Sequence, residues 1–275
     1  MDYILYLLIF CIGTVFGSFF TLAVYRIPLR QDITHTRSYC PKCNHKLSFW
    51  DMIPILSYVF LGGKCRYCGQ KIRPRYLMLE VMSGIVFVLF AISVKLSIFD
   101  IIFLDKQLIA YFITGLLYIA TLFIIAGIDK ENVKIEKPVL LFGFICVTIY
   151  MIYLYIVGIN TNVYRYVIYL IVFGILTIIN TFILRKNAKG NYTIDILLLL
   201  TFMLSFTYEF VCIFSVIITL IAISLQLIIK NILAKKSKCV KTEVKEYTKL
   251  PIGFYLCTAN IITLIVSNLF IFYNS

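Results

Sequence analysis

Long apolar runs recur along the whole of this 275-residue chain, and they limit what it can fold into. Hydrophobic residues make up 61% of the sequence and charged residues 14%, whereas about a quarter of a typical soluble domain is charged. Each run has roughly the 20 residues that an α-helix needs to cross a bilayer. We therefore predict an all-α polytopic membrane protein. The first run starts at Tyr3 without a basic segment before it, so we expect a retained helix rather than a signal peptide.

The apolar runs predict eight membrane-spanning helices. Their approximate bounds are 3–25, 77–97, 107–128, 138–158, 163–184, 194–207, 210–232 and 252–272. The sixth run is short, and only two residues separate it from the seventh. We expect these two runs to form a helical hairpin that turns at Tyr208–Glu209.

The basic residues predict the orientation of the chain in the membrane. If the N-terminus is outside, four loops lie in the cytoplasm and hold 10, 3, 3 and 7 Lys or Arg, which is 23 of the 26 in the chain. These loops are 26–76, 129–137, 185–193 and 230–250. Such segregation is the positive-inside pattern. The net charge of +13 therefore indicates membrane orientation, and we predict no nucleic-acid partner.

Only one of these loops is long enough to form a domain. We expect three parts: a first transmembrane helix over 1–25, a cytoplasmic domain over 26–76, and a seven-helix membrane core over 77–275. The loop has too few residues to bury a large apolar core, so it requires a cross-link such as disulfides or a structural metal ion.

Four cysteines of the loop can supply that cross-link. The loop contains CPKC, with Cys40 and Cys43, and CRYC, with Cys65 and Cys68, and 21 residues separate the two pairs. Two such pairs approximate a zinc ribbon, in which four thiolates surround the metal ion as a closed, structural site. Two disulfides are the alternative, which the reducing cytoplasm disfavours. We therefore predict a structural zinc ion.

Two acids flank apolar runs at the predicted cytoplasmic side. Asp129 ends the third predicted span, in GIDKEN, and Asp195 begins the sixth, in YTIDILLLL. Because the third span runs inward and the sixth outward, we expect both carboxylates at one depth, on the face that carries the cysteine domain. Taken singly, Asp195 is also explained as a helix-start acid and Asp129 as a solvated acid beside Lys130.

A pair of carboxylates in a partly dry site is suited to hydrolysis. Two close carboxylates do not both ionise readily, so one keeps a proton near neutral pH. Such a pair activates water as a base and protonates a carbonyl or a leaving amine as an acid. We therefore predict Asp129 and Asp195 as the catalytic residues of an aspartic endopeptidase. Glu80, one turn into the second span, is expected instead to pair with Arg75 or Lys71 at the rim.

Four segments spread along the chain match the motifs of one known family. They are GSFFTLAVYRIP at the end of the first span, the cysteine loop from CPKC to RPRYLMLE, GID at Asp129, and LPIGFYL before the last span. Together they resemble the prepilin peptidases of type IV pili and competence pseudopili, and the cysteine loop is the most specific match. The resemblance implies that Asp129 and Asp195 are the two catalytic aspartates of that family.

The window around the second aspartate departs from the family pattern. The pattern is G-x-G-D with a lysine two positions on, whereas this chain has Tyr192, Thr193, Ile194 and Asp195, with Leu197 at the lysine position. If the glycines allow close approach of backbone or substrate, their loss alters the geometry or marks a weakened paralogue. Asp195 is still the only acid of this region that can take the second role.

The resemblance implies a bacterial plasma-membrane enzyme that removes the leader of type IV prepilins or pseudopilins. Cleavage follows a glycine at the cytoplasmic face. Family members commonly also N-methylate the new N-terminus with S-adenosylmethionine, and Gly63 and Lys64 in LGGKC resemble the region linked to that activity. A Gly-Gly pair is otherwise a simple turn. The alternative functions are a catalytically weakened paralogue that acts as a pilus-assembly scaffold and, ranked last, a transporter, which requires charged or Gly/Pro-broken segments at mid-bilayer.

Overall fold

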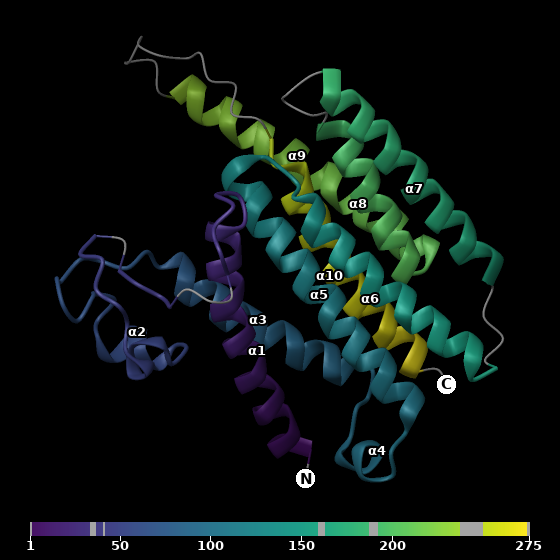
Figure 1. Cartoon of the computed structure of the whole chain (residues 1–275), viewed down its shortest axis with the longest axis horizontal. Helices are drawn as coiled ribbons and strands as arrows, with labels where there is room; N and C mark the ends of the chain where they lie inside the picture. Colours follow the sequence, from purple (N-terminus) through teal and green to yellow (C-terminus); the bar gives the residue numbers. More distant parts are fainter. Residues whose placement is uncertain are drawn as a thin grey trace. The chain divides into compact units, whose positions relative to one another are not determined.

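The structure is a computed structural model that describes residues 2–33, 37–40, 42–158, 163–186, 192–236 and 250–273. Regular structure within these ranges is helical, which confirms the predicted all-α class (Figure 1). The helices, with the 3-10 helix labelled η1, are α1 (Asp2–Arg26), η1 (Phe49–Met52), α2 (Leu56–Phe60), α3 (Arg75–Ser93), α4 (Ile98–Ile102), α5 (Lys106–Asn132), α6 (Lys137–Ile156), α7 (Val163–Lys186), α8 (Tyr192–Phe206), α9 (Glu209–Lys236) and α10 (Ile252–Tyr273).

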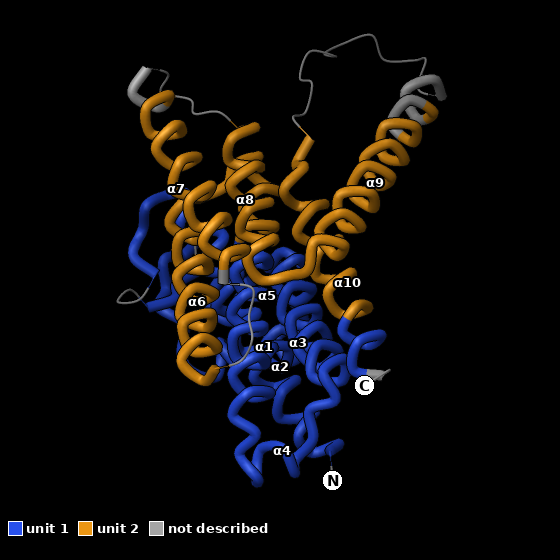
Figure 2. The backbone as a smooth tube through the Cα atoms, turned by 90° about the vertical axis from the view of Figure 1, so that its right-hand side faces the viewer, with its two compact units in different colours: residues 1–124, 268–275 blue, residues 125–267 orange. Residues whose placement is uncertain are grey.

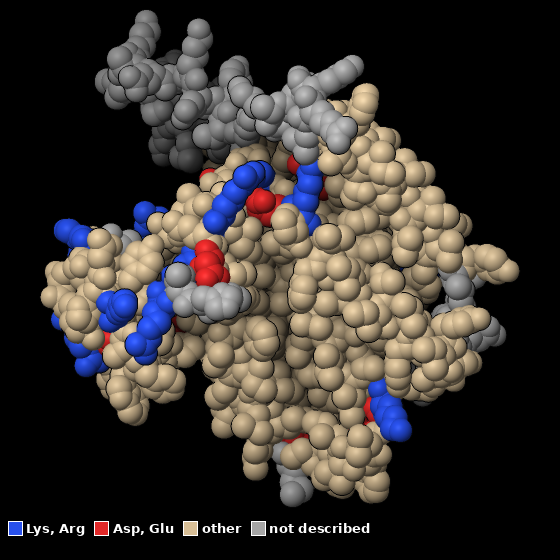
Figure 3. Space-filling view, viewed as in Figure 1, with Lys and Arg blue, Asp and Glu red and all other residues tan. Residues whose placement is uncertain are grey.

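Seven of the described helices are long and apolar enough to cross a membrane, namely α1, α3, α5, α6, α7, α9 and α10. The eighth predicted span corresponds to α8, which is apolar but has only 15 residues. Figure 3 shows a wide uncharged face, with Lys and Arg side chains gathered over the segment that carries α2. The chain is therefore a multi-pass membrane protein.

Two helix ends differ from the predicted bounds. Helix α3 stops at Ser93 because Lys95 adopts a left-handed φ of 53° and the Leu96 N–H donates back to the Ala91 carbonyl at 3.0 Å, a hydrogen bond that closes helix ends. Helix α5 continues past residue 128 to Asn132, so Asp129 lies within the last helical turn rather than after it.

The chain divides into two compact units (Figure 2). The first unit comprises residues 1–124 and 268–275, and therefore contains the cysteine loop with α1, α3 and α4. The second unit comprises residues 125–267 and contains α6 to α9 with the end of α5 and most of α10. The four cysteines belong to the first unit and both predicted catalytic aspartates to the second.

In the first unit, helices α1 and α3 cross with their backbones in close contact. A Cβ atom added to Gly13 would lie 2.8 Å from the Gly84 Cα, and one added to Gly17 would lie 2.7 Å from the Glu80 Cα. The Ser83 hydroxyl also donates to the Gly13 carbonyl at 2.7 Å. Gly13 and Gly17 are thus a G-x-x-x-G pair, the spacing that lets membrane helices approach closely.

This crossing predicts that Gly17→Ala destabilises the first unit. The added methyl group has backbone atoms in its way, so the helices must separate, and overpacking of this kind costs about 1–3 kcal/mol. We expect a lower midpoint of thermal unfolding in detergent. Gly174→Ala in α7 is the matched control, because a Cβ there meets nothing within 4 Å. Equal unfolding midpoints for the two variants would contradict the close crossing.

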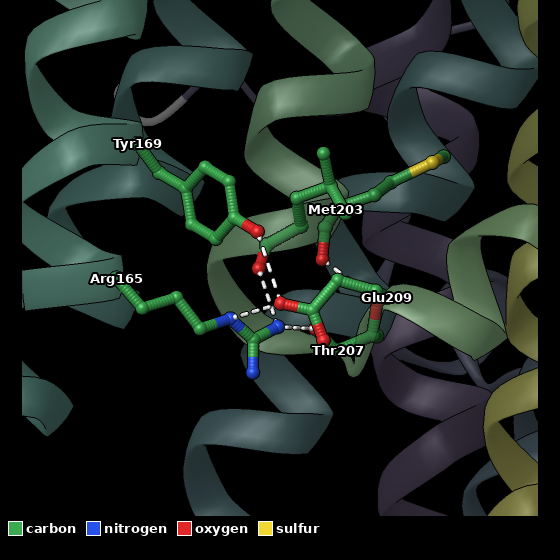
Figure 4. Close-up of polar contacts among 6 residues, drawn as sticks. Arg165, Tyr169, Met203, Thr207 and Glu209 are labelled. Atoms are coloured by element: carbon green, nitrogen blue, oxygen red, sulfur yellow. Dashed lines mark hydrogen bonds and ion pairs between the residues drawn. The ribbon is translucent and has the colours of Figure 1, made fainter. Parts of the chain in front are cut away.

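In the second unit, α8 and α9 form the predicted hairpin, with Thr207 and Tyr208 between them. Figure 4 shows how Arg165 of α7 closes this turn. Its guanidinium donates to the Thr207 carbonyl at 2.6 Å and pairs with the Glu209 carboxylate at 2.8 Å. The Tyr169 hydroxyl donates to the same carboxylate at 3.1 Å. The arginine therefore satisfies the open carbonyl end of α8, a role that favours a cation.

Candidate active site and metal centre

Asp129 is completely buried in the last turn of α5. The Tyr192 hydroxyl lies 2.8 Å from its Oδ1 and 3.0 Å from its Oδ2. The backbone N–H of Phe254 donates to Oδ2 at 2.9 Å. A buried carboxylate is costly unless donors surround it, and these two residues supply the donors from α8 and α10. The interpretation of Asp129 as a solvated acid is therefore wrong.

The first turn of α10 forms one wall of this site. Its free N–H groups carry the positive end of the helix dipole, which favours a carboxylate. The Gly253 N–H donates to the Tyr192 hydroxyl oxygen at 3.2 Å. A Cβ on Gly253 would lie 3.0 Å from the Asp129 Oδ2, which is tighter than ordinary contact. The LPIGFYL segment thus places its glycine where the backbone must approach an acid.

Asp195 lies in the first turn of α8 and is partly buried. The side-chain amide of Asn180, from the middle of α7, donates to its Oδ1 at 2.6 Å. Lys137, the first residue of α6, exerts the largest charge effect on Asp195, followed by Lys134. Since a side chain from another helix fixes this carboxylate, a simple helix-start role does not account for it.

The two acids share the second unit but do not share a proton directly. Neither carboxylate hydrogen-bonds the other in the described part of the chain, and each has its own neutral partner. Tyr192 connects them, because it contacts Asp129 and precedes Asp195 by three residues on α8. Residues three apart lie on one face of a helix. The tyrosine occupies the position of the first glycine in the family's G-x-G-D window, so this departure brings a hydroxyl to Asp129.

The cysteine loop of the first unit forms two knuckles. In the first knuckle, the Cys40 N–H donates to the His45 carbonyl at 3.0 Å, and the Asn44 N–H donates to the Cys40 carbonyl at 2.8 Å. An isolated β-bridge between Tyr39 and Lys46 closes the base. The knuckle is therefore complete within eight residues.

The second knuckle repeats the same backbone pattern. The Cys65 N–H donates to the Gln70 carbonyl at 2.8 Å, the Gly69 N–H donates to the Cys65 carbonyl at 2.9 Å, and a bridge joins Lys64 to Lys71. Gly69 has a φ of 69°, and Asn44 at the equivalent place has 53°. Glycine and asparagine are the residues that adopt this left-handed conformation most readily.

The four thiols of these knuckles converge. The sulfur atoms of Cys40, Cys43, Cys65 and Cys68 all lie within 4.8 Å of one another, and none is in a disulfide. The Cys40 and Cys68 sulfurs are 3.8 Å apart. Thiolates about 2.3 Å from a tetrahedral zinc ion are separated by about 3.8 Å. The donor set and its spacing therefore fit zinc.

Neighbouring backbone groups make these thiols unequal. The Cys43 N–H, helped by the Lys42 N–H and by other thiols, outweighs burial and lowers the pKa of Cys40 to about 7. At Cys68 the Gln70 N–H opposes the shift, but burial and the other three thiols raise its pKa to about 11. Cysteine binds a metal ion as the deprotonated thiolate. A cluster in which Cys40 has a lowered pKa is therefore suited to bind a cation.

Asp51 links the two halves of the cysteine loop. Its Oδ2 accepts from the Ser48 hydroxyl at 2.8 Å and from the Tyr67 hydroxyl at 3.1 Å, and its Oδ1 lies 2.8 Å from the Arg66 Nε. Burial opposes ionisation here. The Ser48, Tyr67 and Arg66 groups outweigh it and hold the pKa of Asp51 below its usual range.

Asp51→Asn is therefore expected to destabilise the loop by about 1.5–3 kcal/mol at neutral pH, the contribution of hydrogen bonds to a charged group. The exposed Arg66 adds little. Because the folded-state pKa is depressed, this contribution is present above the unfolded pKa of about 3.9 and is lost as pH falls through the folded value. Denaturant unfolding followed by Trp50, the only tryptophan, reports the difference. Equal stability at pH 7 would contradict this role.

Glu80 of α3 has a partner that the sequence did not predict. Its carboxylate accepts the Ile55 backbone N–H at 2.8 Å, whereas pairing with Arg75 or Lys71 stays a prediction. Ile55 has a φ of 63°, rare for a β-branched residue, and is the centre of a three-residue turn closed by the Leu56 N–H and the Pro54 carbonyl at 2.6 Å. Glu80 thus anchors a strained turn of the cysteine loop to a membrane helix.

A cavity of about 650 Å³ lies between the cysteine loop and helices α1 and α3. Its lining includes basic, aromatic and acidic side chains, among them Arg26, Tyr39, Arg73, Tyr76 and Glu80. Gly63 and Lys64 do not line it. Gly63 instead lies in the turn after α2 with a φ of 67°. The backbone of Lys64 forms a β-bridge with that of Lys71 at the base of the second knuckle. These two residues stay predictions for the methylation region.

Sequence reasoning missed the side chains that hold the acids. Asn180 lies within an apolar run, and a polar residue in such a run is rare, so the sequence offered a signal for it. In the structure this residue is only 1% exposed. Tyr192 gave no such signal, because tyrosine is common at membrane boundaries. The N–H groups of Gly253 and Phe254 have no side-chain signature, although a glycine two residues after a proline, in the first turn of the last helix, indicates close backbone approach.

A family model matches the first part of the chain. Residues 11–94 match the bacterial peptidase A24 N-terminal domain, a region that ends before Asp129. No solved structure matches the chain.

Several curated relatives carry the name prepilin leader peptidase/N-methyltransferase. The protein of Vibrio cholerae is 37% identical over 94 residues, which are 31% of this chain and 37% of that protein. The protein of Bacillus subtilis is 31% identical over 137 residues, 49% of this chain and 50% of that protein. The protein of Klebsiella pneumoniae is 32% identical over 130 residues, 45% of this chain and 52% of that protein. The chain thus matches about half, or less, of the length of these relatives. Together, the domain match and these relatives show that part of this chain is similar to the type IV prepilin leader peptidases.

Proposed function

We propose that this chain is an aspartic endopeptidase that removes the leader of type IV prepilins or pseudopilins after a glycine. The observation that carries the proposal is the pair of fixed acids, Asp129 at the end of α5 and Asp195 at the start of α8, within one compact unit. The names of its relatives supply the substrate class. The segregated Lys and Arg residues favour a plasma-membrane site with both acids and the cysteine domain at the cytoplasmic face.

The proposed reaction uses one acid as a base and the other as a proton donor. The ionised carboxylate takes a proton from water, whose oxygen attacks the carbonyl carbon after the glycine, while the protonated carboxyl gives its proton to the carbonyl oxygen. Collapse of the tetrahedral intermediate breaks the C–N bond. The leaving amine takes the proton that the first carboxylate removed from water, and one hydroxyl of the intermediate returns its proton to the second carboxylate. Because the two carboxylates are not hydrogen-bonded to each other, the water and the scissile peptide group lie between them in this scheme.

Zinc has a structural role in the proposal. Cys40, Cys43, Cys65 and Cys68 hold it as a closed four-sulfur site, which leaves no position for a reacting water. The ion folds the cysteine loop and takes no part in hydrolysis.

N-methylation of the new N-terminus is the second proposed activity, with S-adenosylmethionine as methyl donor. The cavity beside the cysteine loop has the volume of a small-ligand site. Its arginines suit the carboxylate of such a cofactor, its tyrosine rings suit a sulfonium cation, and Glu80 suits an amino group. When bound, the cofactor supplies a methyl group to the amine. Equilibrium binding of S-adenosylmethionine to the purified chain tests this activity separately from cleavage.

The test of the peptidase is co-expression with a prepilin whose leader ends in glycine, followed by the mass of the pilin on a gel and by mass spectrometry. Loss of the leader supports the proposal. Association with the prepilin without any change in its mass would favour the scaffold alternative, whose support is the loss of both glycines before Asp195.

Tyr192→Phe is expected to slow cleavage about tenfold to a hundredfold. The change removes the hydroxyl that holds both oxygens of Asp129 but keeps the ring, and hydrogen bonds to charged groups contribute about 1.5–3 kcal/mol. Initial rates of leader removal at saturating prepilin measure the effect. Tyr255→Phe is the matched control, because its hydroxyl donates to Gln226 at 2.7 Å rather than to an acid. An unchanged or faster rate for Tyr192→Phe would show that the hydroxyl is not needed.

A further inference from the structure

Two buried polar atoms close to Asp195 have no partner in the described part of the chain. They are the side-chain oxygen Oδ1 of Asn180 and the ammonium nitrogen Nζ of Lys137. Buried polar groups are nearly always hydrogen-bonded, so each unpaired one requires an explanation. One of these atoms is an acceptor and the other is a donor, and both belong to residues that act on the same carboxylate.

Asn180 reaches the site from α7. Its Nδ2 donates to the Asp195 Oδ1 at 2.6 Å, which fixes the plane of its amide. The Oδ1 atom of the same amide is therefore held next to Asp195, and its lone pairs are free to accept a hydrogen bond. The side chain is only 1% exposed, so bulk water does not satisfy this oxygen.

Lys137 lies at the start of α6 and acts on Asp195 through its charge. Helices α6 and α7 both pack against α8. Lys137 has the largest charge effect on Asp195 but forms no ion pair with it in the described residues. Its neighbour Lys134, by contrast, pairs with Glu136 at 2.7 Å. A buried ammonium group without a partner is costly, and a group that binds there relieves this cost.

We propose that Asn180 and Lys137 bind the scissile peptide group of the substrate beside Asp195, with Asn180 Oδ1 accepting its N–H and Lys137 Nζ donating to its carbonyl oxygen. A peptide group offers one donor and one acceptor, the complement of the two unpaired atoms. The inference rests on the proposed peptidase function and assigns two substrate-binding residues to it. Lys137 also brings a positive charge to a site whose lysine position, 197, is a leucine.

The test measures substrate binding in the Asp195→Asn chain, which lacks the charge of Asp195 and is expected not to cleave. The probe is a synthetic prepilin peptide that spans the glycine cleavage point, titrated against the full-length chain in lipid nanodiscs. Asn180→Leu and Lys137→Met remove the two groups and keep much of the side-chain volume. Lys134→Met and Thr181→Val are matched neighbours outside the proposed contacts.

We expect each of Asn180→Leu and Lys137→Met to raise the Kd about tenfold, the effect of one lost hydrogen bond. The two control variants keep the parent Kd. Because Asp195 is already neutral in this chain, an effect of Lys137 that acted only through that carboxylate would disappear. Unchanged Kd values for Asn180→Leu and Lys137→Met would therefore overturn the inference.

A substrate change gives the same answer without altering either residue. Replacing the scissile amide of the peptide by an ester removes its N–H, and we expect about tenfold weaker binding to the Asp195→Asn chain. With Asn180→Leu in the same chain, ester and amide peptides should bind equally. A tenfold difference that persists there would overturn the role of Asn180. If the unaltered chain does not cleave the amide peptide and the Asp195→Asn chain does not bind it, the proposed function itself fails; cleavage with unchanged variant Kd values refutes only this inference.

Discussion

Replacing either Asp129 or Asp195 by Asn is expected to lower the rate of leader removal about 10³-fold, within the range that a positioned acid or base contributes. Asparagine keeps the shape of the side chain and can still hydrogen-bond Tyr192 or Asn180. It neither takes a proton from water nor gives one to a leaving group. The rate is measured with excess prepilin and equal amounts of folded enzyme.

Glu131→Gln is the control for this experiment, because that acid lies two residues after Asp129 and is exposed. It should cleave at the normal rate. The double variant Asp129→Asn with Asp195→Asn should be little worse than either single change, since residues that act as one unit are not additive. If Asp195→Asn processes prepilin at the normal rate, the two-aspartate mechanism is wrong.

Loss of the metal is expected to unfold the cysteine loop. Structural zinc sites of this kind supply about 10–16 kcal/mol of apparent binding free energy, and a segment this short has little apolar core to replace it. Cys40→Ser, or a chelator added to the unaltered chain, should release one zinc ion per chain. Protease sites within 26–76 should then become accessible while the membrane helices persist.

Metal analysis under reducing conditions and limited proteolysis measure these two effects. Cys11→Ser is the matched control, because that thiol is exposed on α1 and lies outside the cluster. It should keep its zinc and its resistance to protease. Purified chain without zinc would contradict the metal centre, and the peptidase proposal would be unaffected.

Much of the fold followed from the sequence, because the membrane imposes long apolar helices. Runs of apolar residues located the spans, and the hairpin at Tyr208 was predicted from the distance between two runs. The ends of α3 and α5 were less accurate. They depend on backbone conformations at Lys95 and Val133, where φ is 53° and 50°, and neither residue type signals a left-handed φ.

The candidate site was predicted only as far as its charged residues. Acids at the ends of apolar helices are conspicuous because charge beside hydrocarbon is expensive. The partners of these acids come from α7, α8 and α10, and pairings across 15, 63 and 125 residues of sequence have no local pattern. The Ile55 backbone N–H that donates to Glu80 was missed for the same reason, since a backbone donor 25 residues away has no local pattern.

The shortness of α8 affects the membrane around it. A helix of 15 residues is about 22 Å long, whereas the hydrocarbon layer is about 30 Å thick. The α9 hairpin and Arg165 anchor its far end, so the mismatch falls at the end that carries Asp195. Lipid beside a short helix adapts by thinning. We therefore expect the bilayer to thin beside α8, which would bring lipid headgroups and their water to the proposed site at Asp195.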